Sequence, residues 1–128
     1  MARLTIRIDL GGDAAIGPGK ARLLELVAAE GSIRGAAIAM GMSYRRAWLL
    51  LREIETAMGA PVVVSQSGGN KGGGTSLTAL GGAVARQYRA IERQASRSVS
   101  SRLQALSDLA WRDGAANSRR KKAALRAG

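Results

Sequence analysis

Four residues divide the middle of this chain into two short helices with a tight turn between them. Ser32 and Ser43 are suited to be N-caps, because a serine hydroxyl can accept a hydrogen bond from a backbone N–H that the first helical turn leaves unpaired. Gly41 can adopt the left-handed backbone that ends a helix, and Gly59, followed by Pro61, is expected to end the second helix. The pattern predicts helices over 33–40 and 43–58. Such a pair is typical of a helix-turn-helix, although many other helical hairpins share it.

The segments before and after this pair predict one more short helix and little β structure. Residues 3–10 alternate apolar and polar side chains, which predicts a half-buried strand that ends at Gly11-Gly12. Its buried face would carry Leu4, Ile6, Ile8 and Leu10. A helix is expected over 18–29, where Leu23, Leu26 and Val27 recur at core spacing. After Pro61, Val62-Val63-Val64 predicts a second strand, so the fold is expected to be mainly α with a small β part.

The helix predicted over 43–58 has two chemically different faces. Its buried face is expected to carry Ala47, Leu51, Ile54 and Met58, with Tyr44 and Trp48 buried on the flank as structural residues. Its outward face would present Arg45, Leu49, Arg52, Glu53 and Thr56, with Arg46 beside them. Arginine can bridge guanine O6 and N7 or bind phosphate, and an exposed leucine can contact a thymine methyl, so this face suits the major groove. The alternative is an ordinary solvated helix face. The exposed leucine argues against it, because an apolar side chain gains nothing from contact with water.

A glycine-rich loop follows the second strand. Residues 68–74 contain five glycines around Asn70 and Lys71. A nucleotide-binding phosphate loop is not expected, because Lys71 is followed by Gly72 and not by Ser or Thr, and the strand–helix–strand context is missing. After a helix-turn-helix, the loop instead predicts the tip of a wing, where backbone N–H groups and Lys71 could approach DNA phosphates. The alternative is a disordered hairpin tip.

The last third of the chain predicts a long helix that begins after its cap, Thr78. The apolar stripe runs through Leu80, Val84, Tyr88, Ile91, Ala95, Val99, Leu103, Leu106 and Ala110. This stripe is longer than so small a domain can cover, so a homodimer seam is expected at Leu80, Val84, Tyr88 and Ile91. Serines at 96–101 weaken the helix, which is expected to run to about Ala95 and to break before a shorter one at 103–111. The predicted organisation is a domain at 1–95, a helical extension at 96–111 and a basic, disordered tail at 112–128.

Charge and composition narrow the function classes. The net charge of +11 divides into zero for residues 1–30, +3 for 31–77, +3 for 78–111 and +5 for 112–128. Such an excess attracts polyanions such as nucleic acid. The chain has no Cys and no His, so disulfides, Cys/His zinc sites, thiol nucleophiles and imidazole bases are excluded, and no enzyme and no cofactor are expected. Neither a membrane span nor a signal peptide is predicted, which favours a cytoplasmic, nucleoid-associated protein.

Several of these residues together resemble a known family. The resemblance rests on Gly31-Ser32-Ile33, Ala36-Ala37, Gly41, Ser43-Tyr44, Ala47-Trp48, the glycine loop at 68–74 and Leu77-Thr78-Ala79-Leu80-Gly81. Over residues 3–95 the chain is similar to the N-terminal DNA-binding domain of the ModE family of molybdate-responsive regulators, winged helix-turn-helix proteins related to the LysR type. The resemblance implies a dimeric DNA-binding regulator with helix 43–58 in the major groove and loop 67–75 as the wing. Full-length relatives carry molybdate-binding Mop β domains after this domain, and residues 96–128 match none of them.

The sequence therefore predicts a winged helix-turn-helix homodimer that binds duplex DNA specifically and regulates transcription. Base edges are assigned to Arg45, Leu49 and Arg52, and phosphates to Ser43, Arg46 and Lys71, with Asn70 beside Lys71 in the wing and the Tyr44 hydroxyl free to reach a phosphate. Effector sensing by a separate partner chain is one open possibility. The alternatives are an architectural nucleoid protein with little sequence preference and an oxyanion-binding protein that uses arginines at the dimer interface.

Overall fold

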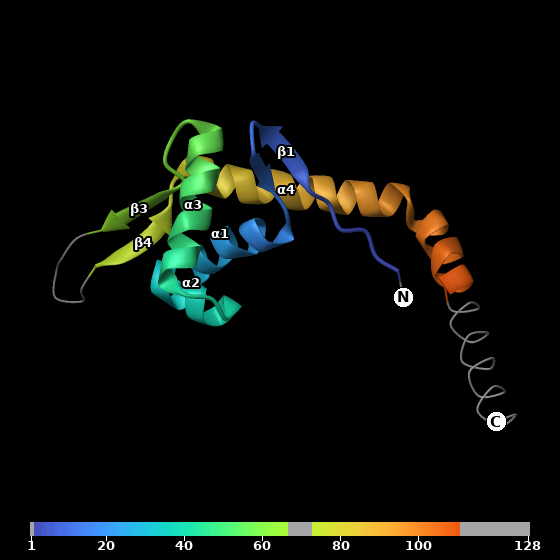
Figure 1. Cartoon of the computed structure of the whole chain (residues 1–128), viewed down its shortest axis with the longest axis horizontal. Coiled ribbons are helices and arrows are strands. Elements are labelled where there is room, and N and C mark those ends of the chain that lie inside the picture. Colours follow the sequence, from blue (N-terminus) through green and yellow to red (C-terminus); the bar gives the residue numbers. More distant parts are fainter. Residues whose placement is uncertain (1, 67–72, 111–128) are drawn as a thin grey trace, which may run out of the picture. The chain divides into compact units, whose positions relative to one another are not determined.

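The computed structural model describes residues 2–66 and 73–110, which form two compact units. One unit contains residues 5–92, and the other combines residues 2–4 with the described residues from 93 onward. The elements, in chain order, are β1 (Ile8–Gly11), β2 (Ala14–Ile16), α1 (Pro18–Glu30), α2 (Ile33–Met40), α3 (Tyr44–Met58), β3 (Val63–Gln66), β4 (Gly74–Leu77) and α4 (Ala79–Ser98) (Figure 1). The mainly α fold with a two-stranded wing is confirmed.

The ends of α2 and α3 are set by the four residues that the sequence singled out. The Ser32 hydroxyl accepts from the Gly35 N–H at 2.9 Å, and the Ser43 hydroxyl accepts from the Arg46 N–H at 3.1 Å. Gly41 ends α2 at φ 69°, a left-handed conformation in which an L side chain would be strained. Both predicted caps are confirmed, and α2 and α3 are joined by the three residues 41–43.

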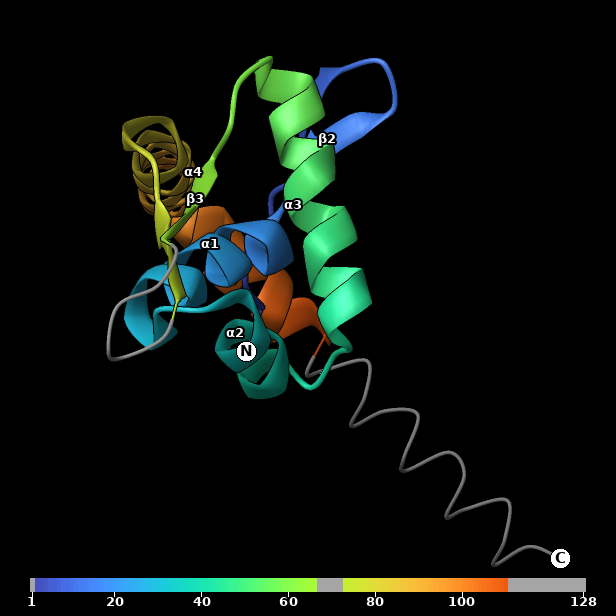
Figure 2. The same ribbon diagram turned by 90° about the vertical axis from the view of Figure 1, so that its left-hand side faces the viewer.

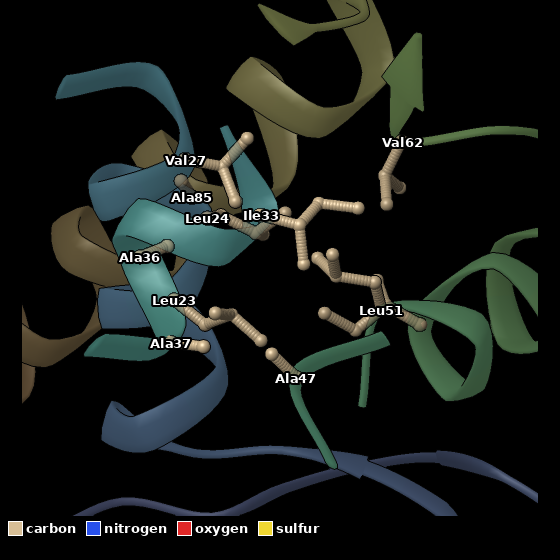
Figure 3. Close-up of a cluster of buried hydrophobic side chains, with 11 residues drawn as sticks. Leu23, Leu24, Val27, Ile33, Ala36, Ala37, Ala47, Leu51, Val62 and Ala85 are labelled. Carbon is tan, nitrogen blue, oxygen red and sulfur yellow. The ribbon is translucent and has the colours of Figure 1, made fainter. Parts of the chain in front are cut away.

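The main core lies where α1, α2 and α3 meet the base of the wing and the start of α4 (Figure 3). Each element contributes small or branched apolar side chains, which can pack at close range. The buried members are Leu23, Leu24, Val27, Ile33, Ala36, Ala37, Ala47, Leu51, Ile54, Val62 and Ala85. This core fixes the rotation of α3 about its own axis, because Ala47, Leu51 and Ile54 all point into it.

The N-terminal segment is a hairpin and not the single strand predicted over 3–10. Only Ile8–Gly11 is β1, and it pairs antiparallel with β2, which the sequence reasoning missed. The predicted alternation is nevertheless confirmed, since even-numbered residues from 4 to 10 are half-buried and odd-numbered ones are exposed. Residues 3–7 lack a strand partner and are therefore not part of the sheet.

Tyr88 of α4 holds this segment in place. Its side chain is 2% exposed, and its hydroxyl donates to the Ile6 carbonyl at 2.7 Å. Burial, with the nearby Glu92 carboxylate, raises the pKa of Tyr88 above its usual value, so the hydroxyl stays protonated and remains a donor. Tyr88 also packs with Ile16 and Ala21 in a second, small core.

The substitution Tyr88→Phe removes only this hydroxyl and leaves the buried ring. We expect a loss of about 1 kcal/mol in the free energy of unfolding, because the Ile6 carbonyl loses its partner. Urea denaturation followed by circular dichroism measures this loss. Tyr44→Phe is the control, since it removes a hydroxyl from an exposed position; an equal change in both variants would contradict the assignment.

The predicted break in the last helix is present, a few residues later than expected. α4 ends at Ser98, Val99 is a turn residue, and the chain is helical again over 100–110. The Ser98 hydroxyl donates to the Ala95 carbonyl at 2.9 Å, a side-chain bond that bends helices by competing for the backbone acceptor.

None of the described helices is long and apolar enough to span a bilayer.

Candidate nucleic-acid interface

The start of α3 presents a basic, solvent-facing surface. With Ala47, Leu51 and Ile54 buried, the 100° step between helical residues turns Arg45 and Leu49 to the opposite side. Arg45, Arg46 and Arg52 are exposed, and Leu49 keeps 43% of its surface in solvent. The exposed positions predicted for this face are thus found.

Tyr44 and Trp48 are not buried, contrary to the expectation from their helical angle. Tyr44 is 54% exposed and Trp48 is 42% exposed. Around the circumference of α3, the core contacts the side that carries Ala47 and Leu51. Among the described residues, no other helix or strand buries the neighbouring flank, where Tyr44 and Trp48 lie. The aromatic flank therefore enlarges the exposed surface next to Arg45 and Leu49.

Arg52 is exposed but already has partners within the chain. Its guanidinium carbon lies 5.3 Å from the centre of the Trp48 ring, and its Nη1 lies 3.6 Å from Glu55 Oε1. These contacts hold Arg52 against the aromatic flank. A base contact by Arg52 would have to replace or share its ion pair, whereas Arg45 and Arg46 form no ion pair within the described residues.

The second half of α3 contacts the hairpin, which the sequence reasoning did not anticipate. Lys20 Nζ lies 2.9 Å from Glu53 Oε2 and donates to the Ala15 carbonyl at 2.7 Å. Figure 2 shows β2 beside this half of α3. The part of the outward face of α3 that no other described element contacts is therefore its first half, around Arg45 and Leu49. We call this part the reading surface.

Hydrogen bonds join the base of the wing to α3. Glu55 Oε2 accepts from the Val62 N–H at 2.9 Å, immediately before β3. The Val62 carbonyl accepts from the Thr78 N–H at 3.0 Å, and the Thr78 hydroxyl accepts from the Gly81 N–H at 3.1 Å, as expected of the cap of α4. One chain of hydrogen bonds thus runs from α3 through Val62, at the base of the wing, to the start of α4.

The wing strands are also attached to the helix-turn-helix itself. β3 and β4 pair antiparallel, with Val63 opposite Leu77 and Gln66 opposite Gly74. The Thr75 N–H donates to the Gly31 carbonyl at 2.8 Å, between α1 and α2. The two wing residues predicted to contact DNA, Asn70 and Lys71, lie outside the described residues.

The comparisons with known proteins agree with this geometry. Residues 19–82 match the model of the bacterial regulatory helix-turn-helix protein, lysR family. The chain belongs to this family. The match runs from α1 to the start of α4 and leaves the β1–β2 hairpin outside.

Individual relatives of this LysR-type domain bear ModE and Mop names, which confirms the ModE resemblance. The molybdenum transport protein ModE of Azotobacter vinelandii is 38% identical over 92 residues, which cover 72% of this chain and 33% of that protein. The molybdenum-pterin-binding protein MopB of Rhodobacter capsulatus is 36% identical over 88 residues, or 69% of this chain and 33% of that protein. The chain spans about a third of the length of these relatives.

A solved structure shares the fold. In the crystal structure of a CbnR_DBD–DNA complex, the similar chain superposes with a TM-score of 0.52 and 24% identity. The alignment covers 69% of this chain and 94% of that one. This likeness shows the fold alone, and the LysR-type family rests on the match of residues 19–82.

The sequence reasoning missed one basic residue of the LysR-type domain. Arg34 lies in the first turn of α2 and is exposed. The available signal was its spacing, because Arg34 lies four residues before Ile38 on the same face of α2. Between Glu30 and Glu53 the chain contains no acidic residue and four arginines, namely Arg34, Arg45, Arg46 and Arg52.

The residues assigned to a dimer seam do not share one exposed face. Leu80 and Val84 are half-buried against the main core, and Tyr88 is buried in its own chain by the hairpin segment. Tyr88 is thus unavailable for the predicted role, because its helical position faces residues 6–16. Ile91 is 43% exposed, so it is the one open residue of the four.

Within residues 2–66 and 73–110, no group of three acidic side chains is arranged to hold a metal ion.

Proposed function

We propose that this chain is a sequence-specific, duplex-DNA-binding transcriptional regulator. The observation that carries the proposal is the exposed pair Arg45 and Leu49 at the start of α3, on a helix whose rotation is fixed by its buried face. Arginine and leucine side chains match guanine edges and thymine methyls in the major groove. The LysR-type family and the ModE relatives support this reading.

Three further groups are assigned to the phosphates. Arg46 is exposed beside Arg45, and Ser43, although its oxygen caps α3, keeps a hydroxyl proton to donate. The exposed Tyr44 hydroxyl lies at the same end of the helix. Asn70 and Lys71 would add contacts from the wing. Phosphate contacts of this kind set position and affinity, while the base contacts set specificity.

The regulator acts as a homodimer in this proposal. Support comes from α4, on which Ile91 is 43% exposed. A two-fold symmetric dimer would read two inverted half-sites. No oxyanion site is assigned within these 128 residues.

Selection of bound duplexes from a random-sequence library tests sequence-specific binding and the homodimer in one experiment. The expected result is one enriched motif with two inverted half-sites. Enrichment of a single, asymmetric half-site would contradict the dimer, and a library without any enriched motif would contradict sequence-specific binding.

The basic tail supplies a prediction about salt. Deletion of residues 112–128 removes a net charge of +5. We expect weaker binding to every duplex and a shallower dependence of affinity on salt, because fewer counterions are released from the phosphates, with an unchanged base preference. Fluorescence anisotropy at several salt concentrations measures this. A changed base preference would place the tail in the reading surface instead.

An architectural DNA-binding protein is the second candidate. The tail charge of +5 and the glycine-rich loop favour it, since both suit binding without base readout. The two candidates differ in how strongly random-sequence DNA competes with the selected duplex for the protein.

A further inference from the structure

A shallow hollow lies between α2 and the start of α3, next to the proposed reading surface. Its volume is about 510 Å³, and it is lined by Arg34, Ala37, Ile38, Met42 and Tyr44. Ile38 is 70% exposed, more than any other large apolar side chain in the described part of the chain. An isoleucine so exposed gains stability only when a partner covers it.

The local sequence explains why these side chains meet. Arg34 and Ile38 are four residues apart on α2, so they lie on the same face. Ile33 and Ala36 occupy the other face and pack in the main core. Because Tyr44 is the first residue of α3, the three-residue turn brings its ring to the edge of the same hollow.

The charge around the hollow favours a polyanion. Arg34 forms no ion pair within the described residues, and the chain has no acidic residue between Glu30 and Glu53. Glu53 itself is paired with Lys20. An exposed apolar side chain beside one arginine that has no ion pair within the described residues suits the edge of a major groove, where a thymine methyl lies close to backbone phosphates.

We propose that α2 extends the DNA-reading surface through this hollow. Ile38 packs against the 5-methyl group of a thymine that flanks the bases read by α3, and Arg34 binds an adjacent phosphate. This inference rests on the proposed DNA-binding function and adds a specificity-determining residue on a second helix.

Removal of single methyl groups from the DNA tests the inference. In the duplex selected by the wild type, each thymine is replaced in turn by deoxyuridine, which removes only the 5-methyl. One replacement, at a thymine that flanks the bases read by α3, should weaken wild-type binding about fivefold, the lower end of the cost of a mismatched base. Ile38→Ala should bind the original duplex about fivefold more weakly and lose its sensitivity to that same replacement.

Two variants serve as controls. Leu106→Ala truncates another exposed apolar side chain, 58% exposed and outside the proposed surface, and should retain the wild-type pattern. Leu49→Ala should lose sensitivity at a different thymine. Because Ile38 is exposed, Ile38→Ala should fold as the wild type does, which circular dichroism verifies.

Failure of this inference can be distinguished from failure of the proposed DNA-binding function. A selected duplex that Ile38→Ala binds as the wild type does, with the same uracil pattern, overturns this inference alone and would leave the hollow to an acidic protein partner. A library with no enriched motif overturns the proposed function together with it.

Discussion

Gly81→Ala is expected to lower the free energy of unfolding by about 3 kcal/mol or more, a large share of the roughly 5–15 kcal/mol that keeps a small domain folded. A Cβ at Gly81 would overlap the carbonyl oxygen of Val62. That carbonyl cannot yield easily, because it accepts from the Thr78 N–H and belongs to a residue with no exposed surface. Denaturant titration of the purified chain measures the loss.

Gly82→Ala provides a matched control one residue later. A Cβ there would meet only the flexible end of Arg86, 2.9 Å away at Nη1. Alanine is favoured over glycine inside a helix by up to about 1 kcal/mol, so this variant should be as stable as the wild type or slightly more stable. Equal destabilisation of both variants would contradict the tight packing of α4 on Val62.

Arg45→Ala is expected to cost about 1–3 kcal/mol of binding free energy on the selected duplex and to relax base preference at one position of each half-site. On random duplexes the loss should be smaller, because only a phosphate contact is removed there. Arg22→Ala is the control, since Arg22 is an exposed arginine on α1 with the same charge. It should change both affinities little.

The comparison of Arg45 with Lys71 separates reading from positioning. Lys71→Ala should weaken binding to all duplexes alike, as expected of a phosphate contact. Gel-shift titrations on selected and random duplexes measure both variants. Equal losses on the two kinds of duplex for Arg45→Ala would refute its assignment to a base edge.

Local features made most of the helical fold predictable. The caps at Ser32 and Ser43 and the stop at Gly41 each depend on backbone hydrogen bonds within a few residues, so the sequence alone specifies them. The β2 strand was not predictable in this way. Its three residues, Ala14–Ile16, are too short for an alternating pattern, and their pairing with β1 forms around a glycine turn.

Burial on the flank of a helix depends on partners distant in sequence. The angular position of Tyr44 and Trp48 is readable from the period, but whether another element covers them is not. Tyr88 shows the converse: its place on the apolar stripe suggested a partner chain, and the segment around Ile6 covers it instead. The pairing of Lys20 with Glu53 likewise joins residues far apart in sequence.

Competition between the selected duplex and random-sequence DNA tests whether the chain binds DNA sequence-specifically. The selected duplex, labelled and bound to the wild-type chain, is challenged with unlabelled random-sequence duplex of equal length at moderate salt. A sequence-specific regulator should keep the labelled duplex bound against roughly a 10³-fold excess of competitor. Displacement at an equal concentration of random duplex would contradict the account and assign the chain to the architectural class.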